Sequence, residues 1–321
     1  MGKKEDRVVQ KSKSWFILII LLVIAIILSF GIGPTGFSLS DLTIPLEVRL
    51  PRIILGIFAG GVLALVGASL QGLLQNPLVD PYTLGIASGA SFGAVIGYMF
   101  GRIGVFTVPV FSFLGALVTM FIVYNLALVR SRITKVSLVL AGVIMSFLFS
   151  GIVMLLMVLT RKPLTEIIYL LMGRLNVVFT NELLISFIII FILSAPVMMY
   201  LFSKWRSLNI LSMNEEVAES LGIDTQKLTR NIFIASSFLI GLVVSFTGAI
   251  SFIGLCVPHI IRLIYGPDHY KVLPLSFLLG ASLLIFTDLV ARSIAPIELP
   301  LSVITALFGV PFFIYLLKKR L

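Results

Sequence analysis

Apolar residues occur in this chain as long runs with almost no charge, separated by polar connectors. A helix needs roughly 20 apolar residues to cross about 30 Å of hydrocarbon. Eight runs qualify: Trp15–Ile32, Ile53–Leu74, Leu84–Gly101, Ile103–Val129, Val136–Thr160, Leu183–Ser203, Val272–Ala291 and Leu299–Leu317. A ninth stretch, Asn231–Tyr265, is too long for one helix, and its glycines and Pro258 predict a full span followed by a short, broken one. The pattern therefore predicts ten crossings.

Only two connectors are long, and each contains the signal of a short helix. The connector Arg161–Glu182 predicts a capped helix around Ile167–Met172, which Gly173 ends. The connector Lys204–Arg230 has an asparagine N-cap followed by two acids, which predicts a surface helix over about Glu215–Leu221. Both segments could also be plain connectors.

Composition agrees with a membrane protein. Of the 321 residues, 59% are apolar and 12% charged, whereas a soluble domain has about 45–50% apolar and about 25% charged residues. The single cysteine excludes an internal disulfide framework. We therefore expect an all-α polytopic membrane protein that forms one transmembrane domain over residues 1–321, with residues 1–14 as a cytoplasmic tail.

The basic residues sort unevenly between the two sides of the membrane. With ten crossings, both termini share a side, and 17 of the 24 lysines and arginines fall on that side. The seven on the other side are Arg49, Arg52, Arg102, Arg161, Lys162, Arg174 and Arg292. Basic residues favour the cytoplasm, so both termini are expected there. The excess of ten positive charges thus relates to the membrane and not to nucleic acid.

Motifs for enzyme chemistry are missing from the sequence. It has no G-x-x-x-x-G-K-[ST] loop for nucleotide phosphates and no G-x-S-x-G or H-E-x-x-H motif for hydrolysis. Cys256 and His259 have a usable ligand spacing, but we interpret them as a packed thiol and a helix-end imidazole. An enzyme is the weakest interpretation, and no metal site or cofactor is expected.

A few polar positions interrupt the apolar spans. Two glutamines, an asparagine and two prolines within Gln71–Pro81 predict a broken helix that faces protein or a water-filled cavity. Asp288 is the only acid inside a predicted span, and Arg292 follows it by one helical turn. Pairing of these two residues is the simpler account, and a proton-relay acid is the alternative. The many small residues in the second and third spans are expected to serve mainly close helix packing.

The sequence contains a weak internal echo. Gly67-Ala68 precedes Pro77 by the same interval as Gly248-Ala249 precedes Pro258. Five spans before and five after would run in opposite directions, so the echo suggests two inverted five-helix halves.

Several short motifs together resemble one family of transporters. They are Arg49-Leu50-Pro51-Arg52, Gln75-Asn76-Pro77-Leu78, Gly248-Ala249-Ile250-Ser251-Phe252-Ile253-Gly254-Leu255, Val257-Pro258-His259-Ile260-Ile261-Arg262, Gly266-Pro267-Asp268-His269, Asp288-Leu289-Val290-Ala291-Arg292 and Glu298-Leu299-Pro300. The chain is similar here to the transmembrane permeases of the ABC importers for ferric siderophores, haem and cobalamin, the FecCD family. The resemblance covers roughly Leu46 to the C-terminus.

The resemblance implies a type II ABC importer permease in the inner membrane of a prokaryote. It implies a second permease copy or related subunit, two cytoplasmic ATPase subunits and an extracytoplasmic binding protein. It also implies roles for individual residues. These are binding-protein docking by Arg49, Arg52 and Arg292, a cytoplasmic gate at Asn76 and Leu78, and ATPase coupling by Glu215, Glu216, Ala218, Leu221 and Gly222.

This chain differs from the family pattern in two places. The loop before Arg49, about Gly33–Val48, is shorter than in other members. Where the cobalamin permease has small hydroxyl residues before its fifth span, this chain has Lys135-Val136, which puts a cation near the inner mouth.

We compare three functions: a passive permease of an ATP-driven importer, a secondary transporter that uses Asp288, and a membrane enzyme. An acidic inner helix and outer arginines without partners in the chain need other proteins only in the first, which we favour. A ferric siderophore is the expected cargo, although haem, cobalamin and molybdate importers share this plan.

Overall fold

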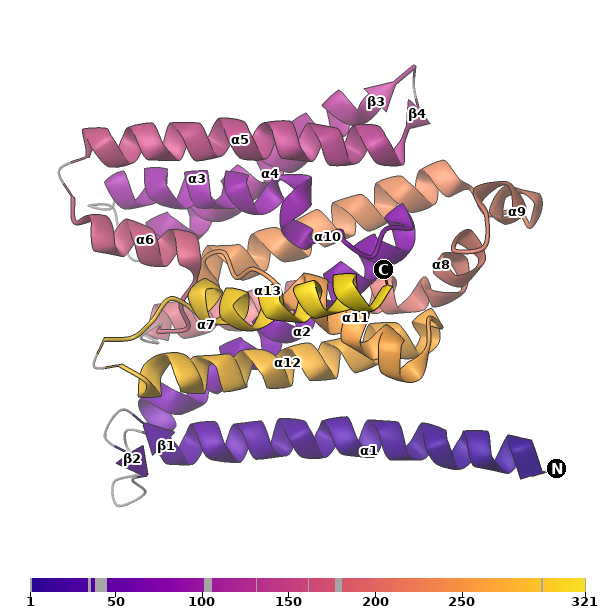
Figure 1. Cartoon of the computed structure of the whole chain (residues 1–321). Coiled ribbons are helices and arrows are strands. Elements are labelled where there is room, and N and C mark those ends of the chain that lie inside the picture. Colours follow the sequence, from indigo (N-terminus) through magenta and orange to yellow (C-terminus); the bar gives the residue numbers. More distant parts are fainter. Residues whose placement is uncertain are drawn as a thin grey trace.

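The computed structural model describes residues 2–33, 36–37, 45–100, 106–130, 132–160, 162–176, 181–295 and 297–320. Arg102 and Arg161, both in the predicted outer set, lie outside the described residues. Most of the described residues are helical, which confirms the all-α prediction (Figure 1). The helices are α1 (Gly2–Gly31), α2 (Leu50–Leu74), α3 (Ile86–Met99), α4 (Thr107–Ala127), α5 (Lys135–Leu159), α6 (Leu164–Met172), α7 (Asn181–Ser203), α8 (Trp205–Leu211), α9 (Glu215–Ser220), α10 (Thr225–Thr247), α11 (Ile253–Tyr265), α12 (His269–Ser293) and α13 (Leu301–Arg320). The smaller elements are the helical turns η1 (Pro45–Arg49) and η2 (Pro81–Leu84), the hairpin of β1 (Ile32–Gly33) with β2 (Gly36–Phe37), and the hairpin of β3 (Leu128–Val129) with β4 (Arg132–Ile133).

Apolar helices occur among the described residues at each of the ten predicted spans, and up to six of them are long and apolar enough to cross a membrane. Five are long and apolar enough to cross a membrane alone, namely α2 with η1, α4, α5, α10 and α12. The pair α7 and α8, bent by 43°, makes a sixth. Four shorter apolar helices, of 10–17 residues each, lie in α1, α3, α11 and α13. The short, broken span expected after α10 is α11.

Two local features go beyond the expectations from the sequence. Residues 2–14, expected as a cytoplasmic tail, are helical and continuous with the first span, because α1 begins at Gly2. The inner connector holds α8 in addition to the predicted helix, which is α9. The outer connector holds α6 as expected, and α6 ends at Gly173 with φ +80°.

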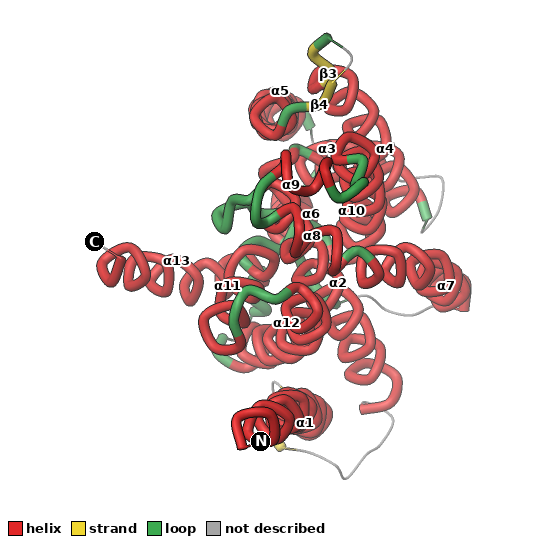
Figure 2. The backbone as a smooth tube through the Cα atoms, turned by 90° about the vertical axis from the view of Figure 1, so that its right-hand side faces the viewer, coloured by secondary structure: helices red, strands yellow, loops and turns green. Residues whose placement is uncertain are grey.

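The helix α2 runs through the middle of the bundle and packs against α12, α10 and α11. The helices α1, α5, α7 and α13 lie at the edges (Figure 2). The approach of α2 to α12 is close because glycine meets glycine. A Cβ atom at Gly60 would collide with the carbonyl oxygen of Gly280, and one at Gly280 would collide with that of Gly60. In lipid, such close backbone packing replaces the hydrophobic force that joins helices in water.

The helix neighbours support two related halves. The helix α2 packs on α12 and α11, and α10 packs on α4 and α3. We match α1–α5 in order with α7, α10, α11, α12 and α13. The contact of α2 with α12 then corresponds to that of α10 with α4, and the contact of α2 with α11 corresponds to that of α10 with α3. Each half has an odd number of spans, so the second half starts from the opposite side of the membrane. The predicted arrangement of inverted halves is confirmed.

The sequence echo that suggested these halves falls on positions that are not equivalent. Gly67 lies inside α2, with Pro77 beyond its end. Gly248, in contrast, lies beyond the end of α10, and Pro258 lies inside α11. The halves are therefore related through helix packing and not through these residues.

The connectors gather at two ends of the bundle (Figure 1). We call the end with β3–β4, α8 and α9 the inner end, after its predicted orientation, and the end with α6 and β1–β2 the outer end. The N-terminus lies at the inner end, and α13 runs back toward it.

Candidate functional site

At the inner end, α2 stops at the exposed turn Gln75–Leu78, which we call the gate turn after its expected role. Gln75 has a left-handed backbone, with φ 51°, and caps α2. The side-chain Oδ1 of Asn76 accepts a hydrogen bond from the backbone N–H of Leu78 at 3.0 Å. The two residues expected at the gate therefore lie on one turn, and the asparagine oxygen already stabilises that turn.

A buried amide lies behind the gate turn, and the sequence marked it only as one polar residue of a broken helix, without its partners. Gln71 Nε2 donates to the carbonyl oxygens of Val79 at 3.1 Å and Gly254 at 3.2 Å. Its Oε1 accepts a hydrogen bond from Arg262. One side chain thus joins α2, the chain after the gate turn and α11. The signal was the glutamine itself, since a polar group in an apolar span must find partners inside the protein.

A second link between the halves lies next to this amide. The carboxylate of Asp80 accepts the backbone N–H of Tyr82 at 3.3 Å and also that of Phe252. The hydroxyl of Tyr82 accepts the N–H of Ile250. The chain after the gate turn is thereby tied to the break between α10 and α11.

The helix α9 at the inner end is the predicted coupling helix. The Asn214 side chain accepts the backbone N–H of Glu216 at 3.2 Å, which caps the helix. Beyond the helix, Gly222 has φ +82°, as a glycine stop requires. Glu216 and Leu221 are exposed. The water-facing side of α9 is therefore acidic with an apolar residue at its end.

Ala218 is an exception to the expected contact surface. It is fully buried because α9 packs against α8 and α10. Ala218, expected to take part in ATPase coupling, therefore has no exposed surface for direct contact with a partner. Its small side chain allows α9 to lie flat on the neighbouring helices.

The outer end holds a buried cluster of charged residues. Arg52 Nη2 lies 2.7 Å from Asp288 Oδ1, and Arg52 Nη1 lies 2.7 Å from Glu298 Oε1. Arg292 Nε lies 3.6 Å from the other oxygen of Asp288. Asp288 is thus held between two guanidinium groups, one on its own helix and one on α2.

The same cluster holds the end of α1. Arg49 Nη1 donates to the carbonyl oxygens of Phe30 at 2.7 Å and Gly31 at 2.9 Å. Arg292 Nη2 donates to the hydroxyl of Ser29 at 2.8 Å. Cations at the last carbonyls of a helix satisfy groups that have no partner within it. The arginines therefore fasten α1 to α2 and α12.

These contacts correct the expectation that Arg49 and Arg52 lack partners in the chain. Arg49, Arg52 and Arg292 are only 4%, 6% and 3% exposed. The cluster contains three guanidinium groups and two carboxylates, which leaves one net positive charge. The cluster meets the surface at Glu298, whose side chain is 34% exposed.

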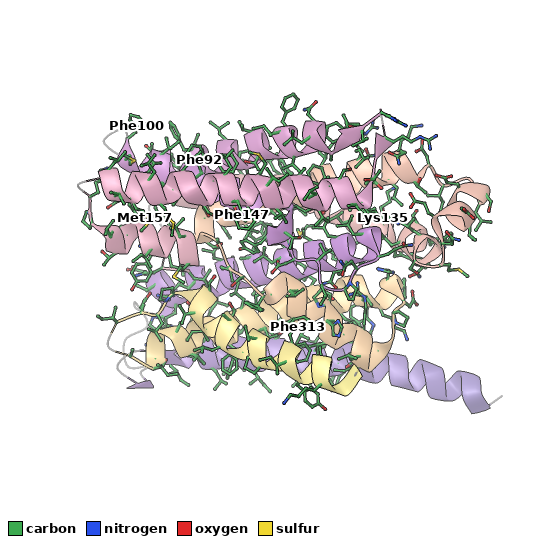
Figure 3. The ribbon with its side chains drawn as sticks, turned by 45° about the horizontal axis from the view of Figure 1, so that its top comes forward. Phe92, Phe100, Lys135, Phe147, Met157 and Phe313 are labelled. Atoms are coloured by element: carbon green, nitrogen blue, oxygen red, sulfur yellow. The ribbon has the colours of Figure 1, made fainter. Side chains whose placement is uncertain are left out.

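One face of α5 is not covered by the chain. Its most exposed large apolar residues are Val136 (77%), Phe147 (76%) and Val158 (82%). They recur at intervals of eleven residues, which is close to three helical turns, so they lie on one stripe. Phe147 marks the middle of α5 in Figure 3.

A cavity of about 390 Å³ lies on another side of α5, between this helix, α3 and α6. Its lining combines hydroxyl groups with thioethers and apolar groups. The hydroxyl and thioether residues are Tyr82, Ser88, Ser91, Ser150, Met154 and Met157.

Known proteins match this chain along nearly its whole length. A family model described as the FecCD transport family matches residues 15–319. The chain is 37% identical to the cobalamin import system permease BtuC of Halobacterium salinarum, over 91% of this chain and 77% of that protein. It is 33% identical to the ferric enterobactin transport system permease FepD of Escherichia coli, over 94% of each. A metal-chelate type ABC transporter solved in an inward-facing conformation superposes with a TM-score of 0.85 at 35% identity, covering 96% of this chain and 99% of that chain.

Proposed function

The chain belongs to the FecCD transport family, and from this premise we propose that it is the permease of an ATP-driven importer that carries a ferric siderophore into the cytoplasm. Family membership makes the chain a membrane permease of the metal-chelate ABC importer kind. Its cargo, partners and orientation are proposed on the following grounds.

The observation that carries the proposal is that α9 and the gate turn lie at the same end of the bundle, where Lys135 contacts both Glu215 of α9 and Gln75 of the gate turn. The sequence has no phosphate-binding loop of its own, so ATP would be hydrolysed by separate subunits that bind α9. Closure of those subunits would move α9 and open or close the gate turn. This assigns the inner end, and with it both termini, to the cytoplasm.

The uncovered stripe of α5 supports a second permease copy. A two-fold axis beside α5 would bury Val136, Phe147 and Val158 against their own copies. The cavity lined by Ser88 and Ser150 would then border the space between the subunits. Small hydroxyl and thioether groups suit a bulky chelate that has to pass without being held tightly.

We also propose that the binding protein docks over Arg49, Arg52 and Arg292 in the outer cluster. The net positive charge of the cluster suits acidic residues on a partner. Because these arginines already bind Asp288, Glu298 and the end of α1, the cluster would have to exchange partners when the binding protein docks.

The secondary-transporter alternative has little support. It requires Asp288 to bind and release an ion, but Arg52 and Arg292 both contact this carboxylate. Both oxygens of Asp288 are thus already engaged by guanidinium groups of the same chain.

The cargo is tested by uptake into proteoliposomes that contain the permease, its ATPase and the binding protein. We expect ATP-dependent uptake of iron-55 as ferrichrome, a hydroxamate siderophore. Cobalamin is the second candidate because of the 37% identical relative. Uptake of labelled cobalamin but not of ferrichrome would transfer the proposal to that cargo. Uptake driven by a proton gradient without the ATPase would overturn the importer.

A further inference from the structure

Three segments that are distant in sequence meet at a single lysine at the inner end. Lys135, the first residue of α5, lies there in Figure 3. Its Nζ is 3.0 Å from Glu215 Oε2 at the start of α9 and 3.0 Å from Gln75 Oε1 in the gate turn. Gln75 Nε2 in turn donates to the carbonyl oxygen of Leu211, the last residue of α8. We call Glu215, Lys135 and Gln75 the inner relay.

The position of Lys135 is unfavourable for α5 taken alone. A cation in the first turn of a helix opposes the helix dipole. The start of α5 is already capped without it, since Thr134 Oγ1 accepts the N–H of Ser137 at 3.0 Å and the Ser137 hydroxyl accepts the N–H of Thr134 at 3.2 Å. Because Lys135 opposes the helix dipole and contributes nothing to the cap of α5, we expect its role to lie in contacts outside α5.

The relay is also placed to change during a transport cycle. The Lys135 and Glu215 side chains are 25% and 43% exposed, and ion pairs exposed to this extent contribute little to stability. Such a contact can break and reform as α9 moves. Gln75 precedes Asn76 directly and has the left-handed backbone that turns the chain out of α2. Movement of the Gln75 side chain would therefore act on the gate turn.

We propose that Lys135 is a positioning residue that transmits the movement of α9 to the gate turn through Glu215 and Gln75. The proposal rests on the proposed importer function. It also gives a role to the cation that stands in this chain where the resemblance to the cobalamin permease led us to expect a small hydroxyl residue.

The test measures the gate turn directly and needs no cargo. Cys256 is the only cysteine, so the parent carries Cys256→Ser and Leu78→Cys, which places one thiol in the gate turn. The rate of maleimide labelling is measured in the permease–ATPase complex, first without nucleotide and then trapped with ATP and vanadate. In the parent, the two states should label at different rates.

Breaking the inner relay should make the labelling rates of the nucleotide-free and the vanadate-trapped states more alike. We expect Lys135→Met to reduce the ratio of the two rates about three- to fivefold, as expected for loss of one exposed ion pair and one hydrogen bond. Lys135→Arg should keep the parent ratio. Glu215→Lys should reduce the ratio, and the exchange of Lys135→Glu with Glu215→Lys should recover most of it, which a merely structural role would not predict.

The matched control breaks another exposed ion pair at the opposite end. Glu166 lies 3.2 Å from Arg174, with side chains 46% and 36% exposed, and Glu166→Gln should leave the ratio unchanged. Lys135→Met that binds the ATPase and labels like the parent would overturn the relay. Loss of ATPase binding in that variant would also overturn it, because Lys135 would then be a docking residue. A parent that binds no ATPase would instead contradict the proposed importer function.

Discussion

At the scale of one residue, Arg52 shows that a buried charge can hold the fold together. Its guanidinium joins α2 to Asp288, 236 residues away, and to Glu298. Taking two charges out of water is costly, and their attraction offsets this cost only while both are present. A docking experiment that reverses Arg52 would therefore place a third acid beside two others and damage the fold.

We predict that Arg52→Gln lowers the free energy of unfolding by about 3 kcal/mol, the cost of leaving a buried charge with a missing partner. Thermal unfolding of the purified permease in detergent measures this change. Adding Asp288→Asn should recover part of the loss, because the two residues share one interaction. Arg174→Gln is the control, since its ion pair is exposed and worth less than about 1 kcal/mol. Normal stability of Arg52→Gln together with slow binding of the binding protein would show that Arg52 acts in docking and not in holding the fold.

Asn76 gives a second prediction for a single residue. Asn76→Ala removes the hydrogen bond from Leu78, worth about 1 kcal/mol, which corresponds to an approximately fivefold change in the population of the closed turn. Basal ATP hydrolysis by the reconstituted complex should rise accordingly. Asn125→Ala removes another asparagine hydrogen bond, to the carbonyl oxygen of Phe121, and should leave the rate unchanged. An unchanged rate in Asn76→Ala would reduce the residue to a helix breaker.

At the scale of elements, α9 has two faces with different roles. Its inward face carries Ala218 and is closed by α8 and α10, whereas Glu216 and Leu221 face water. A bulky residue at 218 would separate α9 from α8 and α10. A loss of coupling in such a variant would therefore not test whether the exposed face of α9 binds the ATPase.

The exposed face is tested by reversing one charge. Glu216→Arg should weaken the binding of the ATPase about tenfold, or roughly 1.4 kcal/mol, because a rim charge then repels its former partner. Affinity is measured by titrating the ATPase onto immobilised permease at two salt concentrations, and the loss should be smaller at high salt. Glu47→Arg, an exposed acid in η1 at the other end of α2, is the control. Equal affinity of Glu216→Arg and wild type would exclude this face as the contact.

At the scale of the whole molecule, α4 and α5 both present apolar residues outward, but only one of them is proposed to meet a second copy. Single cysteines at Phe147 and Val158, in a Cys256→Ser background, should form disulfide-linked dimers in membranes. A cysteine at Phe121 of α4, which is 68% exposed, should not. Cross-linking from α4 but not from α5 would move the interface to the other side of the molecule.

The sequence alone determined the features that depend on neighbouring residues. The eight apolar runs and the broken ninth stretch became apolar helices because a segment in lipid must satisfy its own backbone hydrogen bonds. The N-cap of α9 was predictable because the Asn214 side chain bonds to a backbone group only two residues away, and the end of α6 was predictable because Gly173 adopts a left-handed backbone. The motif at Asn76-Pro77 likewise marked a broken helix, since proline prevents the helix from continuing.

Only the tertiary structure decided which distant residues meet. The sequence left Arg52 without a partner, while the fold brings Asp288 and Glu298 to it from α12 and the segment that follows α12. It put Ala218 on a contact surface, and the packing of α9 on α8 and α10 buries it. It showed Lys135 only as an unexpected cation, and the fold places this residue between α9 and the gate turn. Spans and caps follow from local hydrogen bonding and hydrophobicity, whereas these contacts depend on how whole helices pack, which no short stretch of sequence specifies.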